Sequence, residues 1–368
     1  MTARPTQRFN DDLLLNQVDR ELAEQRFAEI FHVLDFPELR ELFQRYEVLG
    51  SLGKATRHHV GLFAVALAAI GLLAATPLLS DEYGKTWAVV IGVAAAILGM
   101  VGVWIGSFGI LSGESRERWL CARLMTERLR QFQFQILTNR LPEVLSSSEA
   151  GATAKQSFID QRKKWFAEFR LAYEGHLPAR LQAILDDDVE EDFLLLRDEG
   201  VNAVLATGAR LERIFAAYRL LRLEHQLQYA NYKLRAATNF YNSPVNQFRL
   251  LRNIGLGLIL LILTAHLAVA VSLSFHWPTL AGNRVFHFFM LVLVVGILAA
   301  RAVEEGLQPA REVERYTRYR ASVVSILGRF DRAIRPDERV RIMREMERIS
   351  YQEMRGFLKT HFESRYVL

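Results

Sequence analysis

Residues 87–111 read WAVVIGVAAAILGMVGVWIGSFGIL, and residues 254–275 read IGLGLILLILTAHLAVAVSLSF. Neither stretch contains Asp, Glu, Lys or Arg, and each matches the roughly 20 residues that an α-helix needs to cross the bilayer core. Residues 60–79 and 285–300 are similarly apolar. Because lipid offers the backbone no hydrogen-bond partner, such runs must be helical. The sequence therefore predicts four transmembrane helices.

The four apolar runs form two pairs, each joined by a short polar connection, SDEYGKT at 80–86 and HWPTLAGNR at 276–284. Connections this short predict two helical hairpins. Lys and Arg gather before and after each pair, whereas the two tips carry only Lys85 and Arg284. Since positive residues favour the cytoplasmic side, we expect both termini and the central segment to be cytoplasmic.

This topology predicts an all-α membrane protein with a cytoplasmic helical bundle or stalk, because the polar segments show helical periodicity and no strand-like alternation. The expected segments are N-terminal cytoplasmic helices at 1–57, a transmembrane hairpin at 58–112, a cytoplasmic helical region at 113–249, a second hairpin at 250–303, and C-terminal cytoplasmic helices at 304–368.

Local signals predict several helix boundaries. Asn10 to Asp12 are expected to cap the first helix, and Pro37 to begin a short second one. The helix that continues from the second apolar run should stop at about Asn139, before a flexible link at 146–153. A later helix should begin near Val201.

Catalytic signatures are missing from the sequence: it contains no GxSxG, HExxH, phosphate-binding P-loop or dinucleotide-binding GxGxxG motif. We therefore expect no enzyme activity, no cofactor and no nucleic-acid partner. The single cysteine, Cys121, excludes an internal disulfide. The acidic run at 186–192 lacks the alternating spacing and turn glycine of a calcium loop, which indicates a solvated segment and no metal site.

Two features of the apolar runs are candidates for function. His266 lies within 254–275, where an ionisable ring is costly unless it faces water or protein. It is expected to line a pore or act in gating, or else to be a neutral imidazole bonded to a neighbouring helix. Small residues repeat in 87–111 and permit close helix packing, or could line the narrowest part of an oligomeric pore. These residues are Gly92, Ala96, Gly99, Gly102 and Gly106.

A motif follows the first hairpin, Trp119-x3-Arg123-x3-Glu127, and Gln226-x2-Tyr229 follows at a distance. Over about residues 58–249 this pattern resembles the SLATT-type membrane domains of bacteria. The resemblance implies a hairpin with a cytoplasmic helical tail, in a pore-forming effector of nucleotide-signalled conflict systems. It also implies an ion pair between Arg123 and Glu127 in the helix after the span, and places Gln226 and Tyr229 in the packed tail. The second hairpin and the C-terminal helices depart from the simplest family pattern.

The resulting hypothesis is an oligomeric effector of the bacterial inner membrane that forms an ion-conducting pore, gated through its cytoplasmic helices. Its expected partners are the lipid bilayer, further copies of the chain and a cytoplasmic sensor or signalling protein. The alternative is a non-conducting anchor or scaffold that recruits soluble partners through the same helices. A secondary transporter is disfavoured, because intramembrane charge and broken spans are nearly absent.

Overall fold

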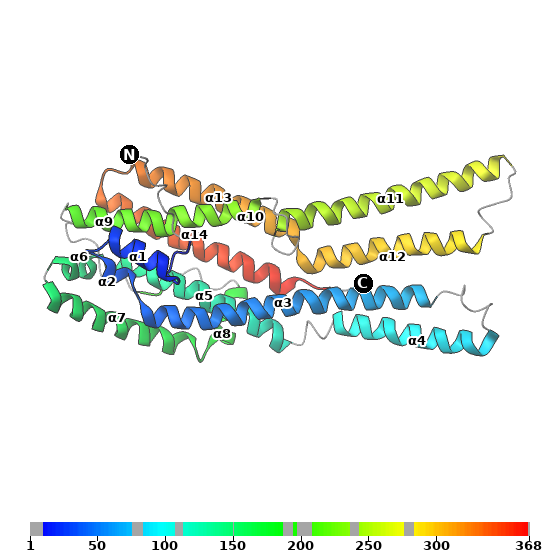
Figure 1. Cartoon of the computed structure of the whole chain (residues 1–368), viewed down its shortest axis with the longest axis horizontal. Helices are drawn as coiled ribbons and strands as arrows, with labels where there is room; N and C mark the ends of the chain where they lie inside the picture. Colours follow the sequence, from blue (N-terminus) through cyan, green and yellow to red (C-terminus); the bar gives the residue numbers. More distant parts are fainter. Residues whose placement is uncertain are drawn as a thin grey trace. The chain divides into compact units, whose positions relative to one another are not determined.

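The computed structural model describes residues 10–75, 84–106, 113–149, 151–186, 194–196, 208–235, 243–275 and 283–366. Over these ranges the chain forms helices and no strand, which confirms the all-α prediction (Figure 1). The chain divides into two compact units, each assembled from three segments. Unit 1 comprises Met1–Ser51, Trp119–Arg235 and Glu314–Lys359, and unit 2 comprises Leu52–Arg118, Ala236–Val313 and Thr360–Leu368.

Unit 1 is a helical assembly. Its elements are α1 (Gln17–Arg26), α2 (Phe31–Leu34), the first part of α3 (Pro37–Ala74), most of α5 (Gly113–Asn139), α6 (Leu141–Glu149), α7 (Gly151–Tyr173), α8 (Leu177–Leu185), α9 (Ala209–Tyr218), the π-helical stretch η4 (Arg219–Glu224), α10 (His225–Leu234), and most of α13 (Pro309–Arg332) and α14 (Pro336–Glu363). The elements α9, η4 and α10 follow one another as a single unbroken helix.

Aromatic side chains form part of the core of unit 1. The buried face of α7 carries Phe166, Phe169 and Tyr173, as its helical spacing predicts. The ring of Phe169 lies 5.0 Å from that of Phe132 on α5 and 4.8 Å from that of Tyr173, centroid to centroid. Such offset aromatic contacts add to the free energy gained by burying the rings.

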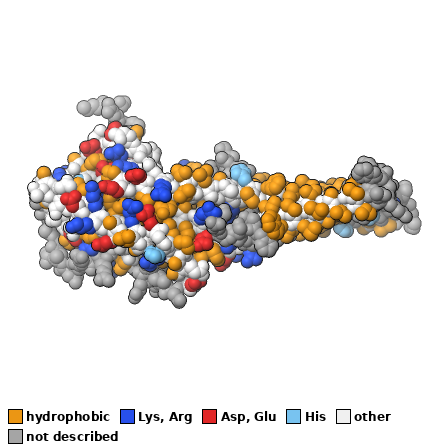
Figure 2. Space-filling view, turned by 90° about the horizontal axis from the view of Figure 1, so that it is seen from below, with side chains coloured by type: hydrophobic (Ala, Val, Ile, Leu, Met, Phe, Trp, Pro, Cys, Tyr) orange, Lys and Arg blue, Asp and Glu red, His pale blue; other side chains and the backbone are white. Residues whose placement is uncertain are grey.

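Unit 2 contains the apolar helices: the remainder of α3, α4 (Gly84–Trp104), α11 (Pro244–Ser274) and α12 (Arg284–Leu307). By length and composition, three helical stretches could cross a membrane, namely Phe31–Ala74, Pro244–Ser274 and Arg284–Arg332, and Val89–Trp104 is a shorter apolar helix. Hydrophobic side chains cover the exposed surface of the apolar helices (Figure 2). A water-soluble protein rarely exposes so large an apolar surface, and together with these three helices it indicates a membrane protein.

Two predictions about the N-terminal helices are wrong. The N-cap of α1 is Asn16, whose side chain accepts a hydrogen bond from the Asp19 amide at 2.8 Å, and Asn10 to Asp12 lie in the preceding segment. Pro37 does begin a helix, but α3 is 38 residues long and not short. Gly50 and Gly53, the first two of its four glycines, cost about 1 kcal/mol each in a helix, too little to end it.

The expected flexible link at 146–153 is helical where it is described, since α6 ends at Glu149 and α7 begins at Gly151. The hydroxyl groups of Ser146 and Ser147 donate to main-chain carbonyls of α6 and so remain compatible with the helix. The end of α5 at Asn139 is confirmed. The predicted start near Val201 lies outside the described residues, and the helix is described from Ala209 onward.

Candidate functional site: a buried ionic network

Six charged side chains of unit 1 form a continuous set of ion pairs, here called the ionic network. It balances three carboxylates against three guanidinium groups: Asp12, Glu127 and Glu347 with Arg123, Arg130 and Arg222. Asp12, Arg222 and Glu347 are 3%, 1% and 1% exposed. Buried charges of this kind are tolerated only when each has its partner.

One half of the ionic network joins η4 to α14. The Nε and Nη2 atoms of Arg222 donate to the two carboxylate oxygens of Glu347 at 2.9 Å and 2.8 Å. This fork-to-fork geometry is stronger and more directional than a single hydrogen bond. The same guanidinium lies 3.7 Å from the Asp12 carboxylate, which connects the pair to the N-terminal segment.

The other half joins that segment to α5. Arg130 contacts Asp12 at 2.8 Å through Nε, and its Nη1 donates to Glu127 at 2.8 Å. Arg123 completes the set by pairing with Glu127 at 2.5 Å, as the sequence predicts for residues four apart. With the neutral partners described below, the network joins the N-terminal segment to six helical segments, α5, α9, η4, α10, α13 and α14, which would therefore have to move together.

Neutral side chains provide further hydrogen bonds to the carboxylates of the network. The Tyr218 hydroxyl of α9 lies 2.8 Å from Glu347 Oε1 and 3.0 Å from the Met343 carbonyl. Gln226 of α10 donates to Asp12 at 3.2 Å and accepts from the Tyr319 hydroxyl of α13 at 3.0 Å. A buried polar network that is satisfied in this way favours one arrangement of the helices that contribute to it.

The π-helical stretch explains how Tyr218, Arg222 and Gln226 reach the same network. In an α-helix, side chains four residues apart point in somewhat different directions around the helix axis. A π-helix has more residues per turn, so over this stretch the angle between such side chains is reduced. π-Helical turns within α-helices frequently occur at functional sites.

Burial and neighbouring positive charges shift the pKa values of the three carboxyl groups in opposite directions. Burial alone would raise the pKa of Asp12, but the charges of Arg130 and Arg222 hold that pKa below its usual value. The pKa of Glu127 is lowered for the same reason by Arg123 and Arg130, again against the effect of burial. At Glu347 burial prevails over Arg222 and raises the pKa. Glu347 is therefore the carboxylate of the network that is protonated most easily as the pH falls.

His225 follows Glu224 at the start of α10 and has an unusual environment. Burial lowers the pKa of its imidazole. Its Nδ1 atom is buried and has no hydrogen-bond partner among the described residues. The ring is therefore neutral at physiological pH.

The structure places Trp119 and Arg123 of the predicted motif against one aromatic ring. The rings of Trp119 and Phe357 make an edge-to-face contact at 5.9 Å, and the Arg123 guanidinium lies 5.6 Å from the centroid of the same Phe357 ring. The ring of Tyr229 meets that of Tyr316 at 5.9 Å. Together with Glu127 and Gln226, these residues border or belong to the ionic network.

Sequence reasoning did not predict the roles of Asp12, Arg130, Arg222 and Glu347 in the network. The sequence contains 46 Lys and Arg residues, and a position that becomes buried is difficult to distinguish among them from a solvent-exposed one. A signal was nonetheless present, since Arg222 lies within the apolar seam that contains Tyr218 and Leu221.

In unit 2 the small residues predicted to pack, which lie in α4 and just after it, divide into two groups. A Cβ atom on Gly102 would lie 2.5 Å from the backbone nitrogen of Ala68 on α3, so these helices approach closely there. Gly99 and Gly106 also lie against protein, the first against Gly71 and the second against the carbonyl of Tyr366. A Cβ on Gly92 would meet nothing within 4 Å, and Ala96 is exposed.

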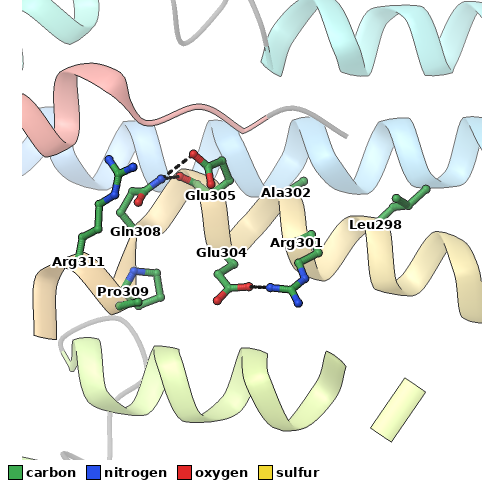
Figure 3. A pocket seen from close by; sticks show the side chains of 9 residues that line it. Leu298, Arg301, Ala302, Glu304, Glu305, Gln308, Pro309 and Arg311 are labelled. Atoms are coloured by element: carbon green, nitrogen blue, oxygen red, sulfur yellow. Dashed lines mark hydrogen bonds and ion pairs between the residues drawn. The ribbon is translucent and has the colours of Figure 1, made fainter. Parts of the chain in front are cut away.

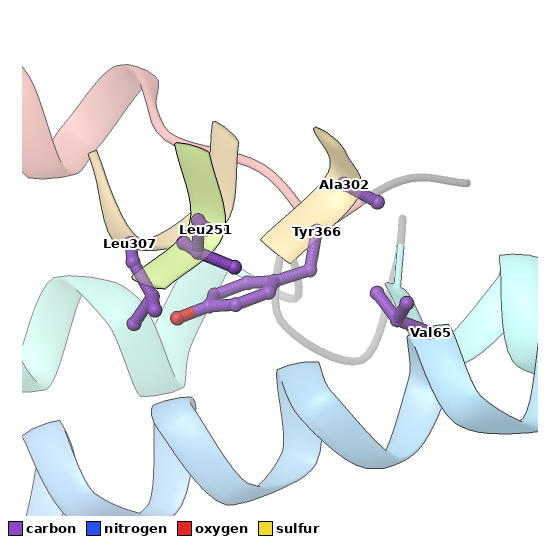
Figure 4. Packing of buried hydrophobic residues seen from close by; sticks show 5 residues of the cluster. All are labelled: Val65, Leu251, Ala302, Leu307 and Tyr366. Carbon is purple, nitrogen blue, oxygen red and sulfur yellow. The ribbon is translucent and has the colours of Figure 1, made fainter. Parts of the chain in front are cut away.

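The C-terminal segment is held within unit 2. The ring of Tyr366 is 1% exposed and packs with Val65, Leu251, Ala302 and Leu307 (Figure 4). Glycines make room for this ring: a Cβ on Gly61 of α3 would lie 2.6 Å from it, and a Cβ on Gly306 of α12 would also collide with it.

Arg57 of α3 secures the same segment. Its guanidinium donates to the carbonyls of His361 and Ser364 at 2.9 Å each. The end of the chain is thereby attached to α3 by hydrogen bonds as well as by the packing of Tyr366.

His266 is exposed on α11, and its Nδ1 atom lies 2.9 Å from the Ile262 carbonyl of the same helix. The part of the chain that the structure describes contains no group of three His, Cys, Asp or Glu side chains placed to bind a metal ion. Of the acidic run at 186–192, only Asp186 is among the described residues.

Comparisons of the chain with protein-family models, with curated proteins and with solved structures give no match.

Proposed function

We propose that this chain is an oligomeric effector of a bacterial inner membrane that forms an ion-conducting pore, gated through its cytoplasmic helices. Its four spans form two hairpins, at 58–112 and 250–303, with unit 1 and both termini in the cytoplasm. The proposed setting is a conflict or defence system, as the SLATT-like motif implies. The protein is not an enzyme in this proposal; it acts by letting ions move down their gradient.

One observation carries the gating proposal. The boundaries between the two units fall inside the helices α3, α5, α13 and α14. Four helices therefore continue from the unit that contains the ionic network into the unit that contains the apolar helices. A signal or partner that rearranges unit 1 would act on these helices directly, and an element with two packed arrangements is what such a switch requires.

His266 supports the oligomeric part of the proposal. An imidazole on the lipid-facing surface of a transmembrane helix costs free energy, and that cost falls if the ring faces another protomer or a water-filled path. The exposure of His266 in the single chain is compatible with either position in an assembly.

The anchor function remains the second candidate, favoured by the local bonding of polar groups on α11. His266 Nδ1 lies 2.9 Å from the Ile262 carbonyl, and the Thr264 hydroxyl donates to the Leu260 carbonyl at 2.8 Å. Since their own helix provides partners for these atoms, neither residue requires a water-filled path.

Reconstitution distinguishes the two functions. Purified protein in liposomes with a potassium gradient should dissipate an imposed potential, and Arg222→Ala, which breaks the ionic network, should change the rate of dissipation. Arg219→Ala, which removes an exposed pair with Asp331 from the same π-helical stretch, is the matched control and should leave the rate unchanged. If the wild-type protein and Arg222→Ala both remain folded and oligomeric yet neither passes ions, the anchor function replaces the pore.

A further inference from the structure

A hollow of about 550 Å³ lies in unit 2 where α12 ends and α13 begins. The chain turns there at Gln308, whose φ of 50° is left-handed, and Pro309 starts the next helix. Charged and polar side chains surround the hollow beside the apolar Leu298 and Ala302 (Figure 3). The charged lining residues are Arg301, Glu304, Glu305 and Arg311.

A second hollow, of about 120 Å³, lies between α11 and α12 and shares Arg301 and Glu304 with the first. Its other charged residue is Arg252, and its remaining wall is apolar: Leu251, Gly255, Leu256, Ile259, Ile297 and Ala300. Arg252 and Arg301 stand just outside the apolar runs 254–275 and 285–300, on the side that carries the positive charge. The two hollows thus combine a charged end at the level of the head groups with an apolar groove that extends along the spans.

We propose that the two hollows form one binding site for a glycerophospholipid with a primary-amine head group, of the phosphatidylethanolamine class. The phosphate pairs with Arg252 and Arg301, the ammonium pairs with Glu304 or Glu305, and an acyl chain lies along Leu256, Ile259 and Ile297. Basic pockets between transmembrane helices on the cytoplasmic side commonly hold lipid head groups.

Charge complementarity selects the head group. The larger hollow presents two arginines and two glutamates, which match a zwitterion better than a purely anionic lipid. No aromatic residue lines either hollow, so the aromatic cage that recognises the quaternary ammonium of choline is missing from these described residues.

The existing ion pair does not block this site. Arg301 and Glu304 lie 2.7 Å apart, but the Arg301 side chain is 71% exposed. Glu304 is 26% exposed, so water screens this pair mainly from the arginine side. The Arg301 guanidinium can therefore leave Glu304 for a lipid phosphate, and Glu304 can then pair with the ammonium group.

Two glycines of α11 permit a matched test of the groove. Gly255 lines the smaller hollow and Gly257 lines neither, yet a Cβ on either residue meets nothing within 4 Å. Gly255→Leu should therefore fill the groove without displacing the backbone, and Gly257→Leu adds the same side chain two residues away. For the phosphate position, Arg252→Ala is paired with Arg249→Ala, an exposed arginine of the same helix outside both hollows.

The measurement is the amount of phospholipid that remains bound to the full chain after purification in mild detergent, read by native mass spectrometry. The second readout is the thermal shift on adding phosphatidylethanolamine, phosphatidylcholine or phosphatidylglycerol. Gly255→Leu and Arg252→Ala should each lower the retained phosphatidylethanolamine at least threefold, whereas Gly257→Leu and Arg249→Ala should not.

Equal retention by Gly255→Leu and Gly257→Leu, with Arg252→Ala unchanged, would overturn the site. A thermal shift with phosphatidylglycerol or phosphatidylcholine as large as that with phosphatidylethanolamine would overturn the head-group assignment. If Gly255→Leu fails to fold, the comparison of Arg252→Ala with Arg249→Ala decides the question. Ion flux is not measured in this test, so its outcome is independent of the pore proposal.

Discussion

Two arginines three residues apart illustrate how environment sets the role of a side chain. Arg219 and Arg222 both belong to η4 and both pair with a carboxylate. Arg219 and its partner Asp331 are 36% and 42% exposed, whereas Arg222 and Glu347 are 1% and 2% exposed at their side chains. Water screens the first pair and cannot replace a lost partner in the second.

Arg222→Ala should therefore destabilise unit 1 strongly, by about 3–5 kcal/mol, because it leaves Glu347 buried without its cation. Arg219→Ala should cost about 0–1 kcal/mol. Denaturant-induced unfolding of the detergent-solubilised chain measures both. Equal losses for the two variants would contradict the buried network.

Two substitutions of Tyr366 distinguish the contribution of its packed ring to stability from that of its hydroxyl group. Its ring fills the space left by Gly61 and Gly306, so Tyr366→Ala should cost about 3–5 kcal/mol through the cavity that it creates. Its hydroxyl is buried without a hydrogen-bond partner among the described residues, so Tyr366→Phe should be neutral or stabilising. Thermal unfolding in detergent provides the comparison, and a large loss in Tyr366→Phe would show that the hydroxyl is bonded.

His32 should make unit 1 sensitive to acid. Burial, followed by the nearby charges of Lys155 and Arg162, lowers the pKa of its imidazole from 6.5 to about 4. Folding therefore favours the neutral ring, and the resulting stabilisation is complete above pH 6.5 and is lost as the pH falls from 6.5 towards 4.

His32→Gln should flatten the fall of the unfolding temperature over this pH range. His176→Gln, at an exposed histidine of the same unit, is the control and should leave the wild-type slope. An unchanged slope in His32→Gln would assign the acid sensitivity to other groups.

At the scale of elements, close packing between α3 and α4 depends on small residues in both helices. Gly71 and Gly99 face each other, and Gly102 faces Ala68 one turn further along α4. Small residues let two backbones approach, and dispersion contacts then stabilise the pair where lipid provides no hydrophobic driving force.

Gly102→Ala should separate α3 from α4 and lower thermal stability, because its Cβ would lie 2.5 Å from the backbone of Ala68. Gly92→Ala adds the same methyl group where nothing lies within 4 Å, and should be neutral or stabilise the helix by up to about 1 kcal/mol. Size-exclusion stability assays in detergent compare the two. If both variants behave alike, the α3–α4 contact is not as close as the backbone places it.

At the scale of the whole molecule, each unit is assembled from three separate segments of the chain. Four helices pass from one unit to the other, so neither unit can be excised as a continuous piece. Lys and Arg gather at the ends of the apolar runs away from the two connecting tips, which predicts that those ends lie on the cytoplasmic side.

Reporter fusions test this topology directly. Fusions at Gly84 and Gly282 should report the periplasm, and fusions at Gly151 and Leu368 should report the cytoplasm, because positive residues resist translocation. A cytoplasmic report from either tip would remove one hairpin from the proposed four-span arrangement.

The sequence by itself determined the class of protein and most of its helices. Apolar runs long enough to span lipid, and helical spacing such as that of Phe166, Phe169 and Tyr173, are local properties that can be read along one stretch of chain. The end of α5 at Asn139 was predicted on the same local basis, and the Arg123–Glu127 pair was expected from the family resemblance. In the serine-rich stretch at 146–153 the turn-like composition misled the prediction: the described residues are helical, and the hydroxyl groups of Ser146 and Ser147 donate to carbonyls of their own helix.

Only the tertiary structure decided which charged residues are buried and which glycines are packed. Arg222 meets Glu347 across 125 positions of sequence, and Arg130 meets Asp12 across 118. Gly92 and Gly102 belong to the same repeated pattern, yet only Gly102 lies against a neighbouring backbone. Burial depends on which distant segments come together, and a pattern that reports one helix at a time does not contain that information.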